Sequence, residues 1–597
     1  MSIPSAVMDG KTVRSRSRIR AGFIPLLVIA AALPFIPYFA TVNPYVLNIF
    51  MQAATYGVAV LGMTVVLGYT GQINLAQGAF FGFGAYAVAL GTAVHGLNFW
   101  VALLLGASVA GVAGFVLGLT TLRLGGHYLA MITISFQQIF DLVMVNWADV
   151  THGPDGIGGI TRPSLFGYQL ADDKAYLLFC AAVLYLMLFL VWWLPRTRLG
   201  RAMRAVRENE MAAEVAGVPT LAVKVTAFTL CAVLAGIGGA LYAAGFAYVS
   251  PDNFNFKVSV EFLTMTLLGG AQSPFGSALG TMLLILLPEW LRFLKEVYLA
   301  AYGLAVILIM VFMPEGIWGI AKAAWRKIRK PDETVTDPIV PLNLDVPISD
   351  SSPILELKNV HKHFGGVRAV DGVDIAVARG TVHALIGPNG SGKTTILNVL
   401  NGIYMPTAGN ILVDGKDLTH TAPHVRASHG VGRTFQNIRL FPALSALENV
   451  MVGAQRKNNP IDRSNAALRE RALSALGFVG MADRANVIVK NLPYGHQRMV
   501  EIARALAGHP KLLLLDEPAA GLNQTEKQEL VVLLKRLRGH GLTIFLIEHD
   551  MGLIERISDR ISVLNFGRKI AEGAPDDVLR HPDVITAYLG ESAHAAA

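Results

Sequence analysis

Long apolar runs fill roughly the first half of the chain, and mixed sequence fills the second half. Because about 20 apolar residues can cross the hydrocarbon core of a bilayer as a helix, these runs predict membrane spans. Several runs are short or rich in glycine, which is typical of broken or re-entrant helices that are buried within protein. We expect eight to ten spans, near residues 22–42, 44–68, 78–95, 99–121, 127–146, 175–194, 224–248, 258–270, 276–291 and 298–313.

From residue 354 the pattern changes to short strands that alternate with turns and helices. The apolar runs 382–386, 511–515 and 543–547 predict strands that are buried on both faces of a parallel sheet. We expect four segments. They are a basic N-terminus (1–20), a transmembrane domain (21–317), a linker (318–352), which its prolines and scattered charges predict to be an extended, solvated tether, and a nucleotide-binding domain (353–597).

Composition supports a membrane protein, since 53% of the 597 residues are hydrophobic and only 15% are charged. The net charge of +8 comes with basic residues that flank the apolar spans, at 11–20, 196–204 and 326–330. By the positive-inside rule, both termini and the nucleotide-binding domain are then cytoplasmic. We expect no nucleic-acid partner, because no stripe of aromatic and basic residues could stack bases. Cys180 and Cys231 lie in apolar spans and form neither a disulfide framework nor a metal-ligand set.

Residues 198–217 form a basic loop between two groups of spans. Charges on one face, alanines on the other and a closing Gly217 predict a short amphipathic helix. Such a helix either docks on the downstream ATPase or lies among the lipid headgroups, and the fusion to an ATPase favours docking.

Polar residues also lie within the apolar half, where lipid would exclude them. They either line a transport path or bind neighbouring helices, and the second role is the more ordinary one. They are Gln72, Asn74, Gln77, His127, Gln137, Gln138, Asp141 and Glu261.

The strongest motif is G-x-x-x-x-G-K-T at residues 387–394, between an apolar strand and an apolar helix. Its glycines let backbone N–H groups point at phosphate oxygens, and the helix N-terminus adds positive charge. Lys393 is expected to reach the β- and γ-phosphates of ATP, and Thr394 to bind Mg²⁺. The predicted nucleotide contacts are Gly387, Asn389, Gly390, Ser391, Gly392, Lys393, Thr394 and Thr395.

Acidic and histidine side chains follow the next two strands. Asp516 can bind Mg²⁺, and Glu517 can polarise the water that attacks the γ-phosphate. His549 at the end of the third strand can contact the γ-phosphate. The fold class is therefore a polytopic α-helical membrane domain followed by an α/β P-loop ATPase domain.

These motifs make residues 354–580 resemble the nucleotide-binding domain of ATP-binding-cassette (ABC) transporters. The resemblance implies ATP and Mg²⁺ as cofactors, Gln436 as the Q-loop glutamine that serves catalysis and the metal, and Phe364 as the aromatic residue stacked on adenine. It also implies that residues 492–497 form the signature, which acts on the ATP held by a partner cassette. The signature residues are Pro493, Tyr494, Gly495, His496 and Gln497.

The sequence departs from that family's pattern at two positions. Pro493 stands where the family has a serine that contacts the γ-phosphate, and Asn523 stands where it has an aspartate. Proline offers neither a hydroxyl nor an amide donor. If the partner cassette differs from this one, we expect the two ATP sites to be unequal.

The apolar half resembles the permease of the branched-chain amino acid importer family at 68–86, 123–133, 151–159 and 198–217. The chain then looks like a fusion of permease and ATPase in an importer of the bacterial inner membrane. The resemblance implies three partners, namely a second permease, a second ATPase and a periplasmic solute-binding protein, with branched-chain amino acids as the small-molecule substrate. Two alternatives stay open: the same importer family carrying urea or short amides, and an exporter half-transporter.

Overall fold

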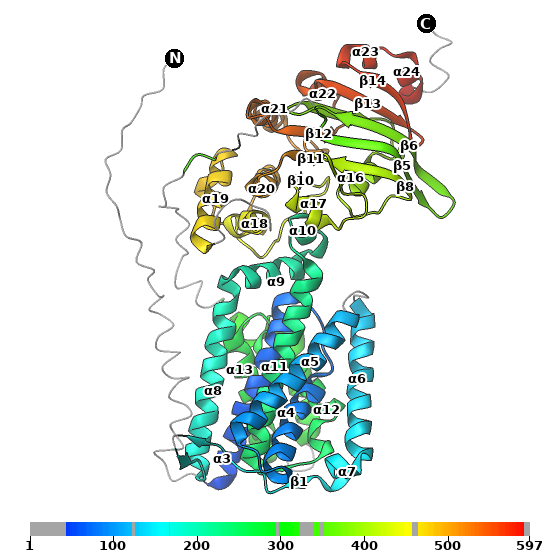
Figure 1. Ribbon diagram of the computed structural model, residues 1–597. Helices are drawn as coiled ribbons and strands as arrows, with labels where there is room; N and C mark the ends of the chain where they lie inside the picture. The colour runs from blue at the N-terminus through cyan, green and yellow to red at the C-terminus, as the bar shows by residue number, and fades with distance from the viewer. Residues whose placement is uncertain are drawn as a thin grey trace.

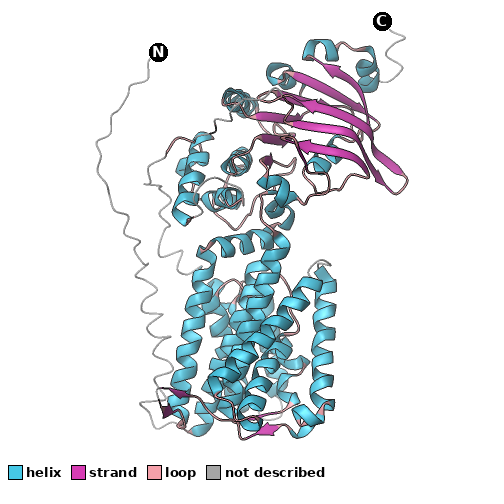
Figure 2. Cartoon of the chain, in the orientation of Figure 1, coloured by secondary structure: helices cyan, strands magenta, loops and turns pink. Residues whose placement is uncertain are grey.

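The computed structural model describes residues 43–121, 126–165, 167–293, 298–313, 315–320, 322, 340–342, 344, 352–456 and 464–589. A bundle of helices forms one half of the molecule, and an α/β domain that carries most of the strands forms the other (Figures 1 and 2). The predicted fold class is confirmed. The predicted span at 22–42 lies outside the described residues.

The helical half contains seven helices that are long and apolar enough to cross a membrane, within the described residues. Two further helices are shorter: α12 has 14 residues and α14 has 15, so each is about 21–23 Å long. The helices are α3 (Pro44–Met63) with η2 (Thr64–Tyr69), α4 (Gln77–Ala89) with η3 (Leu90–Val94), α5 (Phe99–Thr121), α6 (Gly126–Asn146), α7 (Ala148–Thr151), α8 (Asp173–Trp193), α11 (Thr220–Phe246), α12 (Phe256–Gly269), α13 (Pro274–Leu291) and α14 (Tyr298–Phe312).

Helix α11 lies at the centre of the bundle and packs against α3, α4 and α5. The crossing with α4 depends on glycine, because a Cβ at Gly84 would overlap the carbonyl oxygen of Gly236. Small residues at such crossings let two helix backbones approach closely, which is how membrane helices gain packing energy. The glycine-rich runs of the sequence therefore serve helix packing.

The loop between α8 and α11 differs from the single helix that we predicted. It forms two helices, α9 (Arg198–Glu208) and α10 (Glu210–Val215), which break at Asn209. The Asn209 side chain accepts a hydrogen bond from the N–H of Ala212, so it caps α10 instead of continuing α9. Asparagine competes for backbone groups in this way, which makes it a common start of a helix.

The α/β half is built on a six-stranded sheet in the order β10-β11-β12-β7-β13-β14, whose first five strands are parallel. A second, antiparallel sheet has the order β6-β5-β8-β9. The strands are β5 (Leu355–Phe364), β6 (Val367–Val377), β7 (Val382–Ile386), β8 (Ala408–Val413), β9 (Lys416–Asp417), β10 (Val431–Arg433), β11 (Leu512–Asp516), β12 (Thr543–Ile547), β13 (Arg560–Asn565) and β14 (Arg568–Gly573).

Helices connect the strands of this sheet and cover it. Because β7, β11 and β12 are neighbouring parallel strands, the segments that follow them meet at one edge of the sheet. The helices are α16 (Lys393–Leu400), α17 (Pro423–Ser428), α18 (Ala446–Ala454), α19 (Asn465–Phe478), α20 (Tyr494–Ala507), α21 (Gln524–Gly539), α22 (Met551–Ile557), α23 (Pro575–Leu579) and α24 (Pro582–Leu589).

Part of the linker is packed, in contrast to the solvated tether that we predicted. Leu342 and Leu344 are buried in the same apolar cluster as α18, α19 and α20. Two leucines in a charged, proline-rich segment gain free energy by leaving water for this apolar cluster. This stretch of the linker therefore belongs to the surface of the α/β half.

Candidate ATP-hydrolysing site

The P-loop connects β7 to α16, as predicted, and two of its glycines are required by their surroundings. A Cβ at Gly387 would overlap the carbonyl oxygen of Leu564, and one at Gly392 would overlap that of Ala369. Gly392 has a φ of +101° and caps α16 without any side chain. The first N–H groups of α16 therefore remain available to a phosphate.

Lys393 is folded back onto the loop that carries it. Its Nζ donates to the carbonyl oxygens of Gly387 at 2.8 Å and Pro388 at 2.9 Å. Burial lowers the pKa of Lys393, and the nearby carboxylates of Glu517 and Asp516 oppose that shift. The ammonium group thus rests on two carbonyl dipoles at the mouth of the P-loop.

Glu517 stands between the two other residues that the sequence assigns to hydrolysis. Its Oε1 lies 2.8 Å from Nε2 of His549, and its Oε2 accepts a hydrogen bond of 2.8 Å from Nε2 of Gln436. Its φ of +44° is rare for a residue with a side chain, and strain of this kind persists only where the surroundings enforce it. The fold therefore brings Gln436, Glu517 and His549 together from segments that are far apart in sequence.

Asp516 is buried at the end of β11, and one of its oxygens is free. Its Oδ2 lies 3.5 Å from Nη2 of Arg433, whereas its Oδ1 has no partner among the described residues. Burial raises the pKa of Asp516, and Arg433 opposes that shift. Thr394, the second residue of α16, is exposed. An unpaired carboxylate oxygen fits a Mg²⁺ ion, which prefers oxygen ligands.

Several other predicted residues lie at the surface, whereas Ser391 and Gly495 are buried. Phe364 is 43% exposed at the end of β5 and packs edge-on against Tyr404, with ring centroids 5.2 Å apart. Pro493 caps α20, and both Pro493 and Tyr494 are exposed there. Asn523 caps α21 through a reciprocal pair of hydrogen bonds with Glu526. This accounts for the asparagine, because it is among the best capping residues.

Helix α9 joins the two halves of the molecule. On the α/β side, Nη2 of Arg204 lies 2.7 Å from Oε1 of Glu448, and Nη2 of Arg201 donates to Oδ1 of Asn465 at 2.7 Å. On the membrane side, Nη1 of Arg207 donates to the carbonyl oxygen of Gly68 at 3.0 Å. The docking interpretation of this loop fits these contacts, and Figure 1 shows α9 and α10 at the junction of the two halves.

Apolar contacts connect the same junction to the ATP site. One buried cluster includes Met203 and Val206 of α9 together with Phe435 and Phe441 of the α/β half. Phe435 precedes Gln436, whose amide is bonded to Glu517. A displacement of α9 therefore has a short, packed route to Gln436 and Glu517.

Polar residues in the membrane half are bonded to one another across helices. Nε2 of Gln77 donates to the carbonyl oxygen of Ala59, and Oε1 of Gln137 accepts from Oγ of Ser259 and from the N–H of Ala79. For Gln77 and Gln137 these contacts favour the interhelical role over a transport lining. The side chain of His127 lies outside the described residues.

Both halves of the chain match known protein families. A profile described as the permease component of the branched-chain amino acid transport system matches residues 45–314. An ABC transporter profile matches 370–520, and one for the branched-chain amino acid ATP-binding cassette transporter matches 568–594.

Two individual relatives and one solved structure are similar to parts of this chain. The branched-chain amino acid transport ATP-binding protein BraF of Pseudomonas aeruginosa is 44% identical over 254 residues, covering 40% of this chain and 100% of BraF. The permease protein LivM of Salmonella typhimurium is 35% identical over 333 residues, covering 52% of this chain and 76% of LivM. A crystal structure of a nucleotide-free ATP-binding cassette from an ABC transporter is 32% identical, with a TM-score of 0.37, and covers 40% of this chain and 100% of that one.

This chain belongs to the branched-chain amino acid ABC transporter family. It joins the permease and the ATP-binding component in one polypeptide, in that order, as the sequence predicted. The prediction that its cassette binds ATP and hydrolyses it in transport is confirmed at the level of the family.

Sequence reasoning missed several residues that hold the cassette's site in place. Arg498 and Glu501 are fully buried on α20, and Nη1 of Arg498 lies 3.1 Å from Oε2 of Glu501. Arg498 donates to the carbonyl oxygens of Phe435 and Gln436, so it ties the signature helix to the Q-loop. Glu548 accepts from the N–H groups of Ala519 and His549. The sequence did offer a signal for these residues, namely charged side chains within segments that are otherwise apolar. Buried charges are nearly always paired, so such residues are expected to contact one another or the backbone.

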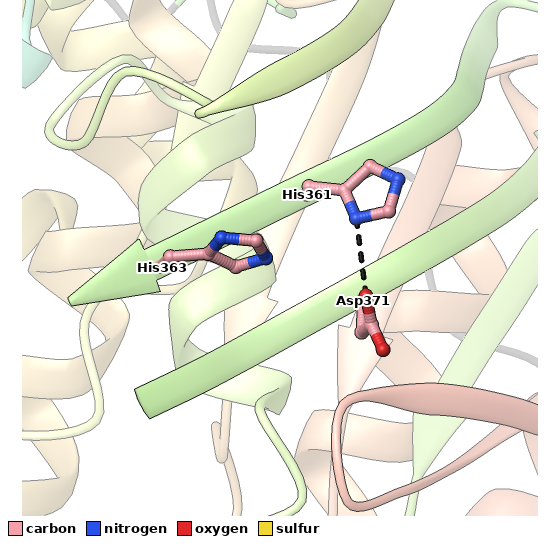
Figure 3. Close-up of side chains that lie close together, drawn as sticks. All are labelled: His361, His363 and Asp371. Carbon is pink, nitrogen blue, oxygen red and sulfur yellow. Dashed lines mark hydrogen bonds and ion pairs between the residues drawn. The ribbon is translucent and has the colours of Figure 1, made fainter. Parts of the chain in front are cut away.

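Two histidines and an aspartate lie close together near Phe364 (Figure 3). Nδ1 of His361 is 3.2 Å from Oδ1 of Asp371 on β6, and His363 lies beside them on β5, the strand of His361. The Arg568 guanidinium bonds the other carboxylate oxygen and holds the pKa of Asp371 below its usual value. Because Arg568 already neutralises this carboxylate, we interpret the group as an anchor for the strand end that carries Phe364, and not as a metal site.

Reversing the Arg204–Glu448 pair is expected to uncouple the two halves. In Arg204→Glu or Glu448→Arg, like charges face each other at the junction, so transport per ATP hydrolysed should fall several-fold. The pair is partly exposed and contributes only about 1 kcal/mol or less, so the fold should persist. The measurement is the ratio of solute uptake to phosphate release in the assembled transporter.

The double variant Arg204→Glu/Glu448→Arg should recover much of that ratio. Arg560→Glu is the matched control, because it reverses a surface ion pair with Glu572 that lies in β13 and β14, away from α9. An unchanged ratio in both single variants would contradict a coupling role for the contact.

Proposed function

We propose that this chain is the permease and ATPase subunit of an ATP-driven importer of branched-chain amino acids. The relatives of both halves are named for the transport of these amino acids. Nothing in the described residues favours urea, short amides or export over this substrate class and direction. The domain boundaries proposed are 21–317 for the permease and 353–597 for the cassette.

One observation carries the proposal, which is the continuous path from the membrane half to the hydrolytic residues. Arg207 bonds the membrane helix end at Gly68, and α9 shares a buried cluster with Phe435, the neighbour of Gln436. Gln436 in turn bonds Glu517. Closure of two cassettes around ATP can therefore bias the membrane half between two arrangements, and hydrolysis can reverse that bias.

The proposed Mg²⁺ site consists of Thr394, Gln436 and Asp516. The unpaired Oδ1 of Asp516 and the hydroxyl of Thr394, an exposed residue, are suited to the ion. When bound, Mg²⁺ neutralises charge on the phosphates of ATP. Among the protein's own groups, Lys393 compensates phosphate charge, Glu517 polarises water, and His549 holds the Glu517 carboxylate in place.

The working assembly proposed here needs three further components. A second permease completes the membrane pore, a second ATPase completes the pair of cassettes, and a periplasmic binding protein delivers the solute. The assembly lies in the bacterial inner membrane with both termini and the cassette in the cytoplasm. The exposed Pro493 and Tyr494 at the start of α20 are suited to meet the ATP of the second cassette.

Uptake by cells tests this function. Cells that lack their own branched-chain amino acid transporters would express the chain with its partner subunits and receive radiolabelled leucine, isoleucine, valine or urea. We expect accumulation of the three amino acids and none of urea. Accumulation of urea alone, or export of preloaded leucine, would contradict the proposal.

Pro493 is expected to limit the ATP site to which the partner cassette contributes its P-loop. In Pro493→Ser a hydroxyl and an N–H donor return to the start of α20, so hydrolysis in the assembled transporter should rise by about two- to fivefold. Steady-state phosphate release measures this. An unchanged rate would show that Pro493 does not limit the partner's site.

A further inference from the structure

The C-terminal tail of the cassette packs behind the strand that leads into the P-loop. Helices α23 and α24 form this tail, and Figure 1 shows them beside β13 and β14, at the end of the cassette remote from the membrane half. Val578 and Val584 of the tail are buried in one cluster with Ala384 and Ile386 of β7. The tail therefore covers the face of β7 whose next residue is Gly387.

A hydrogen bond connects this tail directly to the P-loop. The backbone N–H of Gly387 donates to the hydroxyl oxygen of Tyr588 on α24, at 2.8 Å and across 201 residues of sequence. Burial raises the pKa of Tyr588, so the hydroxyl stays protonated at physiological pH. The P-loop thus obtains a fixed partner from the last described helix of the chain.

The residue that Tyr588 holds also binds the phosphate-binding lysine, through the next peptide. Gly387 receives Nζ of Lys393 on its carbonyl oxygen while its N–H is bonded to Tyr588. Gly387 has little freedom to move elsewhere, because its Cα faces the carbonyl oxygen of Leu564 on β13. One residue therefore links the tail, the strand that precedes the loop and the phosphate-binding ammonium group.

We propose that Tyr588 is a positioning residue of the ATP site, which fixes the first peptide of the P-loop and so sets the affinity for ATP. It touches neither the phosphates nor the attacking water. Its loss should weaken ATP binding and leave the hydrolytic step unchanged, because Gln436, Glu517 and His549 form a separate group of contacts. The inference rests on the proposed role of residues 387–394 as the ATP-binding loop.

Tyr588→Phe tests the inference, because phenylalanine keeps the ring and removes only the hydroxyl. An unpaired, partly buried N–H at Gly387 should raise the dissociation constant for ATP by about three- to tenfold. The probe is an ATP analogue with a fluorescent methylanthraniloyl group, titrated into the purified full-length chain. In the assembled transporter the KM for ATP should rise by a similar factor at unchanged kcat.

Thr586→Ala is the matched control. Thr586 lies on the same helix, and its hydroxyl donates only to the carbonyl oxygen of Pro582 in its own helix, at 2.9 Å. We expect no change in nucleotide affinity for this variant. Equal affinities of Tyr588→Phe and the wild type would overturn the inference, and so would a fall in kcat at unchanged KM.

A second variant is designed to detach α24 from β7. In Val584→Asp a charge enters the apolar cluster, so α24 should leave β7 and take Tyr588 with it. Adding Tyr588→Phe to this variant should then weaken binding no further, and a full additional loss would overturn the inference. If the wild-type chain failed to bind the analogue at all, the proposed ATP site itself would be wrong, which is a separate outcome.

Discussion

Glu517→Gln is expected to reduce ATP hydrolysis by at least about a hundredfold while ATP binding persists. The carboxylate is held by His549 on one oxygen and by Gln436 on the other, both at 2.8 Å. Glutamine has the same size and still hydrogen-bonds, but its neutral amide cannot accept a proton from the attacking water. Phosphate release by the assembled transporter measures the loss, and titration with the fluorescent ATP analogue measures binding.

Asp550→Asn serves as the control for that experiment. Asp550 follows His549, but its carboxylate caps α22 and pairs with Lys527 at 2.8 Å instead of facing the site. Because this pair lies near the surface, hydrolysis should stay within about twofold of the wild type. Substantial hydrolysis by Glu517→Gln would show that another residue activates the water.

Arg498→Met is expected to destabilise the cassette by about 3 kcal/mol, because it removes one of the two buried arginines, Arg498 and Arg504, that pair with the buried Glu501. It also removes the donors to the carbonyl oxygens of Phe435 and Gln436, so the Q-loop loses its attachment to α20. ATP hydrolysis should fall together with stability. Denaturant unfolding of the purified chain and phosphate release measure the two effects.

A second substitution tests whether the guanidinium geometry of Arg498 is required. Arg498→Lys keeps the charge but cannot reach two carbonyl oxygens and a carboxylate together, so stability should recover only in part. Arg580→Met, at an exposed position, is the control and should change the free energy of unfolding by less than about 1 kcal/mol. An equally small change in Arg498→Met would contradict the structural role of the buried pair.

The nucleotide site was predictable because its residues sit at the ends of strands that the sequence marks clearly. Parallel strands β7, β11 and β12 lie side by side, so the P-loop, Asp516, Glu517 and His549 had to meet. The same reasoning could not decide the role of the polar membrane residues. Gln137, for example, bonds Ser259, a partner 122 residues away that no local pattern reveals.

Other features depend on contacts between elements that only the folded chain brings together. The tie between Gly387 and Tyr588 spans 201 residues, and a tyrosine near a C-terminus carries no signal of its own. The break at Asn209 reflects a competition between side chain and helix that the amphipathic pattern of residues 198–217 conceals. The burial of Leu342 depends on an apolar cluster formed by helices of the cassette that follows it.

Reconstituted transport tests the central claim, that the cassette of this chain drives solute through its own membrane half. The complete transporter would be placed in proteoliposomes with ATP on the cassette side and with leucine-loaded binding protein on the other side. We predict ATP-dependent accumulation of leucine by the wild type and none by Glu517→Gln. Accumulation at an undiminished rate without ATP, or by the Glu517→Gln transporter, would contradict this account.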